Sequence, residues 1–102
     1  MQTHIREKVE IIVERAQMRR VLDLVDGLGA TGYTVLPTIA GKGHHGLRTE
    51  EGVARVFDSV MIVAITTEPV ARAILSEVGA AMRDYIGIVA VSDVEVARPE
   101  HF

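Results

Sequence analysis

The residue types in this chain best suited to binding a ligand are concentrated in one glycine-rich segment. Residues 41–46 read GKGHHG, and Arg48 follows shortly after. Consecutive glycines let backbone N–H groups form a concave nest for an anion, and a neighbouring lysine or arginine adds positive charge. The segment also matches the G-x-G-x-x-G pattern of dinucleotide-binding folds, but no amphipathic helix follows it, as that fold requires. We therefore predict an anion-binding loop, with a surface loop that binds nothing as the alternative.

The two adjacent histidines of this segment, His44 and His45, raise the possibility of a metal site. Neighbouring side chains on an extended chain point to opposite sides, so they rarely share one ion. A catalytic zinc ion usually has three protein ligands, and no third ligand lies nearby in the sequence. Solvated histidines are the favoured interpretation.

No arrangement of residues typical of an enzyme is present. The chain lacks cysteine and asparagine, and no Ser-His-Asp arrangement has the sequence context of a nucleophile elbow. Glu50, Glu51 and Asp84 could position a water molecule for a slow nucleotide phosphohydrolase, but their spacing does not support it. We expect a protein that is not an enzyme and that needs no cofactor.

The length and composition are typical of one small globular domain, which spans residues 1–102. Hydrophobic residues make up 48% of the chain and charged residues 25%, with a net charge of −3. An acidic balance argues against nucleic-acid binding, which requires a basic surface. No apolar stretch approaches the roughly 18 residues of a membrane helix, and the first residues are not a signal peptide. We expect a cytoplasmic protein that is not inserted in a membrane.

The hydrophobic pattern predicts an α+β domain in the order βαββαβ, a ferredoxin-like arrangement. Glycines close the first helix, and Pro69 lies in the first turn of the second. A loop of about residues 40–57 without periodicity separates the second and third strands, and loops this long in compact domains are usually functional or disordered. The predicted strands are 8–14, 32–39, 59–66 and 86–96, the last in two parts (86–91 and 94–96), and the predicted helices begin near 18 and 67.

Two of the predicted strands are continuously apolar. Residues 60–65 and 86–91 have the composition of strands that are buried on both faces. Two helices can cover only one face of a four-stranded sheet. We therefore expect an obligate homo-oligomer in which another copy of the chain covers the second face, the alternative being that the terminal segments fold back over it.

One motif resembles a known family. Residues 29–35, GATGYTV, are similar to the Gly-x-Thr-Gly-x-Thr-Val that precedes the long loop of the PII signal-transduction superfamily, and the resemblance spans about residues 9–96. The loop is shorter than in true PII proteins and has no tyrosine to be uridylylated. MRDYIGI at residues 82–88 replaces their phosphate-binding glycine loop. In these features the chain is more similar to the PII-like proteins of inorganic-carbon metabolism, above all to the carboxysome-associated PII-like proteins of chemoautotrophic proteobacteria.

The resemblance implies a homotrimer that binds adenine nucleotide, ADP or AMP, in clefts between subunits, together with bicarbonate. Adenine is expected near Thr34, Leu36 and Pro37. The residues expected around the phosphates are Gly41, Lys42, Gly43, Arg48, Tyr85, Ile86, Gly87 and Arg98. Bicarbonate is expected at Gly41, Lys42 and Gly43.

The function that follows is a sensor of inorganic-carbon metabolism. Ligand binding would order the loop and change its docking on a protein target, a transporter or a carboxysome-related protein. The alternative from another class is a trimeric divalent-metal-binding protein of the cation-tolerance type, with His44 and His45 as its only support.

Overall fold

The structure is a computed structural model in which the backbone is described for residues 1–38, 40–43, 46–49 and 58–102, and side chains for 1–38 and 58–102. Its elements are β1 (His4–Glu14), η1 (Arg15–Gln17), α1 (Met18–Gly27), β2 (Thr34–Pro37), β3 (Ala40–Gly43), β4 (Gly46–Thr49), β5 (Ser59–Thr66), α2 (Glu68–Ala81), β6 (Gly87–Val96) and η3 (Pro99–His101). The expected α+β class is therefore confirmed.

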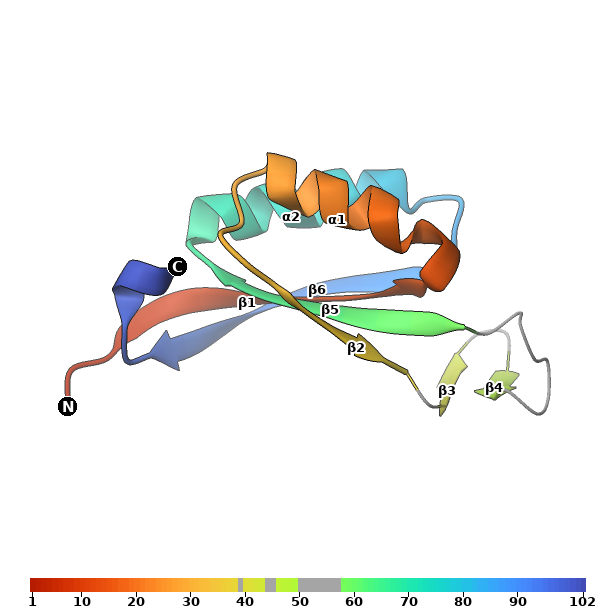
Figure 1. Cartoon of the computed structure of the whole chain (residues 1–102), viewed down its shortest axis with the longest axis horizontal. Helices are drawn as coiled ribbons and strands as arrows, with labels where there is room; N and C mark the ends of the chain where they lie inside the picture. The colour runs from red at the N-terminus through yellow and green to blue at the C-terminus, as the bar shows by residue number, and fades with distance from the viewer. Residues whose placement is uncertain (39, 44–45, 50–57) are drawn as a thin grey trace.

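The main sheet is four-stranded, with the order β2-β5-β1-β6, and every neighbouring pair is antiparallel. Both helices lie on one face of this sheet (Figure 1). This is the ferredoxin-like arrangement that the hydrophobic pattern predicts. Gly29 follows α1 with φ +108°, a backbone conformation that favours glycine, as expected for the residue that ends a helix.

Two predicted strand ranges were wrong: β1 begins at His4 rather than at residue 8, and β2 covers only Thr34–Pro37 rather than residues 32–39. The predicted range of β6 is confirmed to within one residue, but β6 is one continuous strand, because it pairs with β1 from Gly87 to Val96 despite polar Ser92 and Asp93. Residues 40–49 also contain a hairpin, β3 with β4, where the sequence predicts only loop. Backbone hydrogen bonds form a strand ladder without any apolar pattern, so hydrophobic periodicity cannot detect such a hairpin.

The core lies between the helices and the sheet face that they cover. It contains the inward-facing residues of β1 and β5 and the apolar stripes of both helices. Its fully buried large side chains are Val9, Ile11, Val13, Val21, Val25, Val60, Ile62, Ile74 and Val78. The buried residues of the two helices are Val21, Leu22 and Val25 on α1 and Ala71, Ile74 and Val78 on α2.

The opposite face of the sheet is not covered by any part of the chain that the structure describes. Across it, Leu36 pairs with Met61, Met61 with Ile12, and Ile12 with Ile88, so that one residue from each strand forms a continuous line. We call these four residues the apolar row. Leu36 is 46% exposed and Ile88 is 59% exposed. The expected burial of β6 on both faces is thus not achieved within one chain.

Candidate functional site

Most of the predicted ligand-binding residues lie at one end of the sheet. Pro37 pairs with Val60, and Gly87 pairs with Val13, so the end of β2 and the start of β6 lie at the same end, beyond which the β3–β4 hairpin follows (Figure 1). We call this the loop end. The chain therefore brings together residues that are about 50 positions apart in sequence.

β2 supplies the predicted adenine contacts. It is an edge strand of the main sheet, and Thr34, Leu36 and Pro37 on it are all exposed. Thr34 and Leu36 lie on the uncovered face, and the N–H of Thr38 donates to the carbonyl of Ser59 at 3.1 Å, which fixes the end of the strand. Among the residues that the structure describes, no strand pairs with the outer edge of β2, and this edge beside exposed apolar Leu36 and Pro37 suits the polar rim and flat face of a nucleobase.

The hairpin contains the glycine-rich segment. In its register Gly41 lies opposite Arg48, Lys42 opposite Leu47, and Gly43 opposite Gly46. Two of the predicted phosphate residues, Gly41 and Arg48, are thus cross-strand partners. His44 and His45 lie outside the described residues, as do Glu50 and Glu51.

The turn between α2 and β6 supplies the third group of predicted residues. The N–H of Tyr85 donates to the carbonyl of Met82 at 2.9 Å, and the side chains of Tyr85 and Ile86 are 43% and 41% exposed. Gly87 is closely packed: a Cβ there would lie 2.7 Å from the Ile12 carbonyl oxygen and would overlap the Met82 side chain. This turn therefore requires glycine where it enters the sheet.

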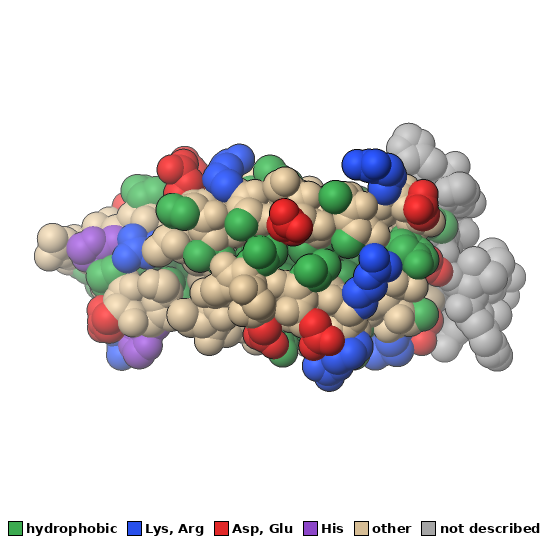
Figure 2. Space-filling view, turned by 90° about the horizontal axis from the view of Figure 1, so that it is seen from above, with side chains coloured by type: hydrophobic (Ala, Val, Ile, Leu, Met, Phe, Trp, Pro, Cys, Tyr) green, Lys and Arg blue, Asp and Glu red, His purple; other side chains and the backbone are tan. Residues whose placement is uncertain are grey.

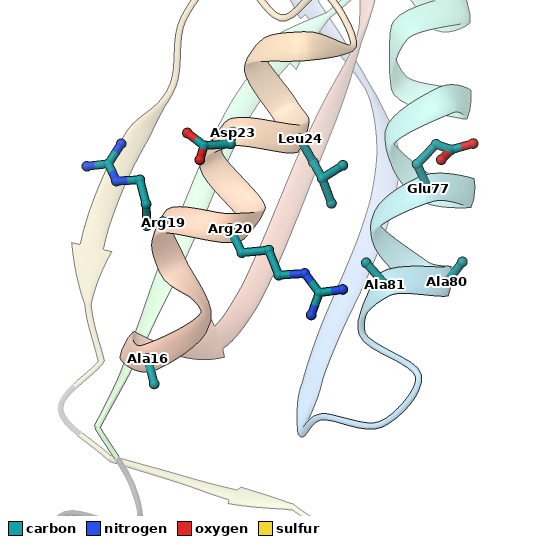
Figure 3. A pocket seen from close by; sticks show the side chains of 8 residues that line it. All are labelled: Ala16, Arg19, Arg20, Asp23, Leu24, Glu77, Ala80 and Ala81. Atoms are coloured by element: carbon teal, nitrogen blue, oxygen red, sulfur yellow. The ribbon is translucent and has the colours of Figure 1, made fainter.

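Arg20 on α1 contacts this turn, and that contact was not predicted from the sequence. Its guanidinium lies 5.6 Å from the centre of the Tyr85 ring, within cation–π range. Figure 3 shows Arg20 reaching from α1 toward α2 across a shallow groove, whereas Arg19, which also lines the groove, extends from α1 on the side away from α2. No sequence signal links Arg20 with Tyr85, because the contact depends on how the two helices pack.

The groove itself has mixed charge. Arg19, Arg20, Asp23 and Glu77 line it together with small apolar side chains. Figure 2, which looks onto the helices, shows acidic and basic side chains interspersed over this face. The helical face therefore offers an anion less net positive charge than the hairpin sequence does.

Arg98 lies at the other end of the sheet. Its strand, β6, ends where Val96 pairs with His4, nine residues from Gly87, which corresponds to about 30 Å along the strand. Arg98 is exposed there. One chain therefore cannot bring Arg98 to the loop end, and a cleft that uses both must combine two chains.

A buried acidic group, Glu7, lies on β1. Glu7 is 4% exposed, and Arg72 on α2 approaches its carboxylate at 3.4 Å. A hydrogen bond to Asp93, its register partner on β6, together with burial and the charge of Asp93, raises the pKa of Glu7 above its ordinary value, while Arg72 opposes this.

Neither metal binding nor membrane insertion finds support in the described residues. Within the ranges that the structure describes, no three His, Asp or Glu side chains are placed to hold a metal ion. Neither α1 nor α2 has the length and apolarity of a membrane-spanning helix.

The chain belongs to the P-II family, because the model of nitrogen regulatory protein P-II matches residues 6–101. The resemblance predicted from the sequence is thereby confirmed. Proteins of this family are signalling regulators. A search of curated proteins finds no match.

Solved structures give a closer comparison. CPII, a nitrogen regulatory PII-like protein from Thiomonas intermedia K12 bound to ADP, AMP and bicarbonate, matches with TM-score 0.87 and 30% identity over 99% of this chain and 96% of that chain. Its complex with ADP and bicarbonate gives TM-score 0.85 and 33% identity over 99% and 97%. GlnK of B. subtilis with ATP, at TM-score 0.63, 12% identity and 96% and 98% coverage, supports the fold alone.

Proposed function

We propose that the chain is a PII-like sensor that binds ADP or AMP, together with bicarbonate, in clefts between the subunits of a homotrimer. The observation that carries the proposal is the separation of Arg98 from the other predicted ligand residues, about 30 Å along β6. A cleft built from two subunits joins the loop end of one to the Arg98 end of the next. CPII, which is known with ADP, AMP and bicarbonate, supports the choice of ligands.

The apolar row supports the oligomer. Large apolar patches left exposed on a single chain mark interaction surfaces. Leu36 and Ile88, at the two edges of the sheet, are about half exposed, and a second and third copy of the chain would bury them. The proposed trimer therefore accounts for the apolar composition of β5 and β6.

The proposed ligand contacts follow from the three elements at the loop end. Adenine lies against β2 at Thr34, Leu36 and Pro37. The phosphates meet backbone N–H groups of the glycine-rich hairpin and of the turn, with positive charge from both subunits; the residues are Gly41, Lys42, Gly43, Arg48, Tyr85, Ile86 and Gly87 of one subunit and Arg98 of the next. Bicarbonate shares Gly41, Lys42 and Gly43, because its negative charge suits the same nest.

In this proposal the ligands act by changing the conformation of the loop at residues 40–57. Ordering of a segment by ligand contacts is a common switching mode, and the ordered loop docks differently on a transporter or a carboxysome-related protein of inorganic-carbon metabolism. The protein acts in the cytoplasm, where adenine nucleotides are available, and it needs no catalytic residue.

A calorimetric titration tests the function. Purified protein is titrated with ADP, AMP, ATP and cyclic AMP, each with and without bicarbonate. Tighter binding of ADP or AMP in the presence of bicarbonate is expected, since two ligands that stabilise one loop conformation are positively coupled. Absence of binding in all eight titrations would refute the proposal.

A variant pair locates the site. Lys42→Ala is expected to weaken nucleotide or bicarbonate binding while the oligomer stays intact. Arg19→Ala removes the same charge from α1, in the groove between the helices, and should leave the affinity as in the wild type. Equal affinities for both variants would count against the glycine-rich hairpin as the anion site.

A further inference from the structure

The C-terminal segment, residues 98–102, turns back on the sheet instead of continuing β6. Val94 is the register partner of Arg6. If β6 stayed extended, residue 99 would lie about 16 Å further along the strand. Instead, the carbonyl of Pro99 lies 3.5 Å from Nη2 of Arg6. We call residues 98–102 the C-terminal turn, and the reversal places Arg98 at its beginning.

Arg6 holds this turn from β1. Its Nη1 donates to the carbonyl of Ile5 at 2.8 Å, while its Nη2 reaches the carbonyl of Pro99. The planar guanidinium makes both contacts from fixed positions, which an ammonium group on a flexible stem cannot do. Nη1 therefore anchors the guanidinium to β1, and Nη2 faces the turn.

A second contact ties the same turn to the segment that leads into β2. Thr31 Oγ1 donates to the carbonyl of His101 at 3.1 Å. Inside the turn, the N–H of Phe102 donates to the carbonyl of Pro99 at 3.1 Å. The C-terminal turn is thus supported from both β1 and the α1–β2 connection, although Arg98 itself is exposed.

We propose that Arg6 is a positioning residue for ligand binding: by holding Pro99 it fixes Arg98 in the orientation in which Arg98 meets the phosphates in the neighbouring subunit's cleft. This inference rests on the proposed function and adds to it a residue outside the predicted site. Its energetic basis is preorganisation, since an arginine held in place before binding loses less conformational entropy when it binds.

The first arm of the test needs no ligand. Hydrogen–deuterium exchange is measured on the C-terminal peptide of the intact oligomer for the wild type, Arg6→Lys, Arg6→Gln and Arg19→Ala. Exchange at Phe102 is expected to be faster in both Arg6 variants and unchanged in Arg19→Ala. Wild-type exchange rates in Arg6→Lys and Arg6→Gln would overturn the inference, whatever the protein binds.

The second arm is a double-mutant cycle on ADP affinity with Arg6→Gln and Arg98→Gln. We expect Arg6→Gln to weaken binding about two- to tenfold, the range for one side chain that must be ordered on binding. In the Arg98→Gln background it should have no further effect, because Arg6 acts through Arg98. If Arg6→Gln caused only a structural defect, it would weaken ADP binding by the same factor in the wild-type and Arg98→Gln backgrounds, and that result would overturn the positioning role.

The two proposals fail in different ways. If the wild type binds no adenine nucleotide, the proposed function and the ligand role of Arg6 are both refuted, whereas the exchange arm still decides whether Arg6 holds the turn. If the wild type binds ADP and Arg6→Gln binds it equally well, the function stands and the role of Arg6 is refuted. Adenosine, which lacks phosphate, serves as the matched ligand, and its affinity should not respond to Arg6→Gln.

Discussion

The guanidinium of Arg20 on α1 lies 5.6 Å from the centre of the Tyr85 ring in the turn between α2 and β6. The contact joins the first helix to a turn that comes more than 60 residues later. With this contact in place Tyr85 is 43% exposed. The arginine therefore covers part of a ring that would face water without it. The orientation of this turn, and of the proposed phosphate contacts in it, therefore depends partly on α1.

Replacing Arg20 should loosen that turn. An exposed cation–π contact contributes about 0.5–1 kcal/mol, so Arg20→Ala should lower the free energy of unfolding by about that amount at fixed protein concentration. Tyr85→Phe keeps the ring and should behave like the wild type, while Tyr85→Leu should lose the contact. Denaturant titration measures all three, and coupling between Arg20→Ala and Tyr85→Leu in a double-mutant cycle identifies the pair. Additive effects would show that the two side chains do not interact.

Gly87→Ala should be strongly destabilising. The new Cβ would lie 2.7 Å from the Ile12 carbonyl oxygen and 3.3 Å from Val13 Cγ1, so the start of β6 would have to move away from β1. Overpacking of this kind costs about 1–3 kcal/mol. Gly27→Ala is the matched control: its Cβ meets nothing within 4 Å, and alanine favours the helix, so no loss of stability is expected there. A melting temperature unchanged by Gly87→Ala would contradict the close packing.

Stability should fall as the pH rises through the titration range of Glu7. The pKa of Glu7 is raised above its ordinary 4.5 in the folded chain by the hydrogen bond to Asp93, by burial and by the charge of Asp93. The folded state therefore holds a proton that the unfolded state has released, and folding loses stability between pH 4.5 and the raised pKa. The side chain at position 7 stays neutral in Glu7→Gln. The melting temperature of this variant should therefore rise relative to that of the wild type as the pH increases through this range.

Arg72 provides a second test of the Glu7 carboxyl group, because Arg72 lowers the pKa that Asp93 and burial raise. Its guanidinium, 3.4 Å from Glu7, favours the charged carboxylate. Removing that charge in Arg72→Gln should raise the pKa of Glu7 further and extend the pH range of falling stability upward. Parallel melting curves for the wild type, Glu7→Gln and Arg72→Gln across this range would show that the carboxyl pair does not control the pH dependence.

The apolar row predicts which surface substitution dissociates the proposed homotrimer. Ile88→Glu places a charge on the uncovered face, next to Ile12 of β1, and sedimentation velocity should show dissociation toward monomers. Ile5→Glu is a stringent control, because Ile5 is also 59% exposed but lies outside the row. If Ile5→Glu dissociates the oligomer and Ile88→Glu does not, the interface lies elsewhere.

The sequence predicted those parts of the fold that hydrophobic periodicity encodes. The strand at 59–66 and the helices that begin near 18 and 67 were predicted, because side chains that pack in one core leave an apolar pattern in the sequence, whereas the alternation of buried and half-buried residues along β5 was not predicted. The hairpin at Gly41 was missed because paired backbones need no apolar side chain. The continuity of β6 was missed because Asp93 interrupts its apolar pattern, although Asp93 pairs with Glu7 on the neighbouring strand.

The candidate site was predicted only where one segment carries a composition signal. The glycines at 41 and 43 could be selected from composition, whereas the turn at Tyr85 was implied only by the family resemblance, and the register brings their elements to one end of the sheet. Arg6 and Arg20 could not be selected, because their roles arise from contacts with Pro99 and Tyr85 that form only after the chain has folded. The spacing of residues along the chain does not indicate which of them will form such pairs.

The placement of Arg98 and the loop end at opposite ends of β6 has a genetic consequence. If each cleft takes one half from each of two chains, a chain defective at Lys42 and a chain defective at Arg98 fail separately, but together they form mixed oligomers in which some clefts receive both intact halves. Co-expression of the two defective alleles would then restore part of the response that neither allele supports alone.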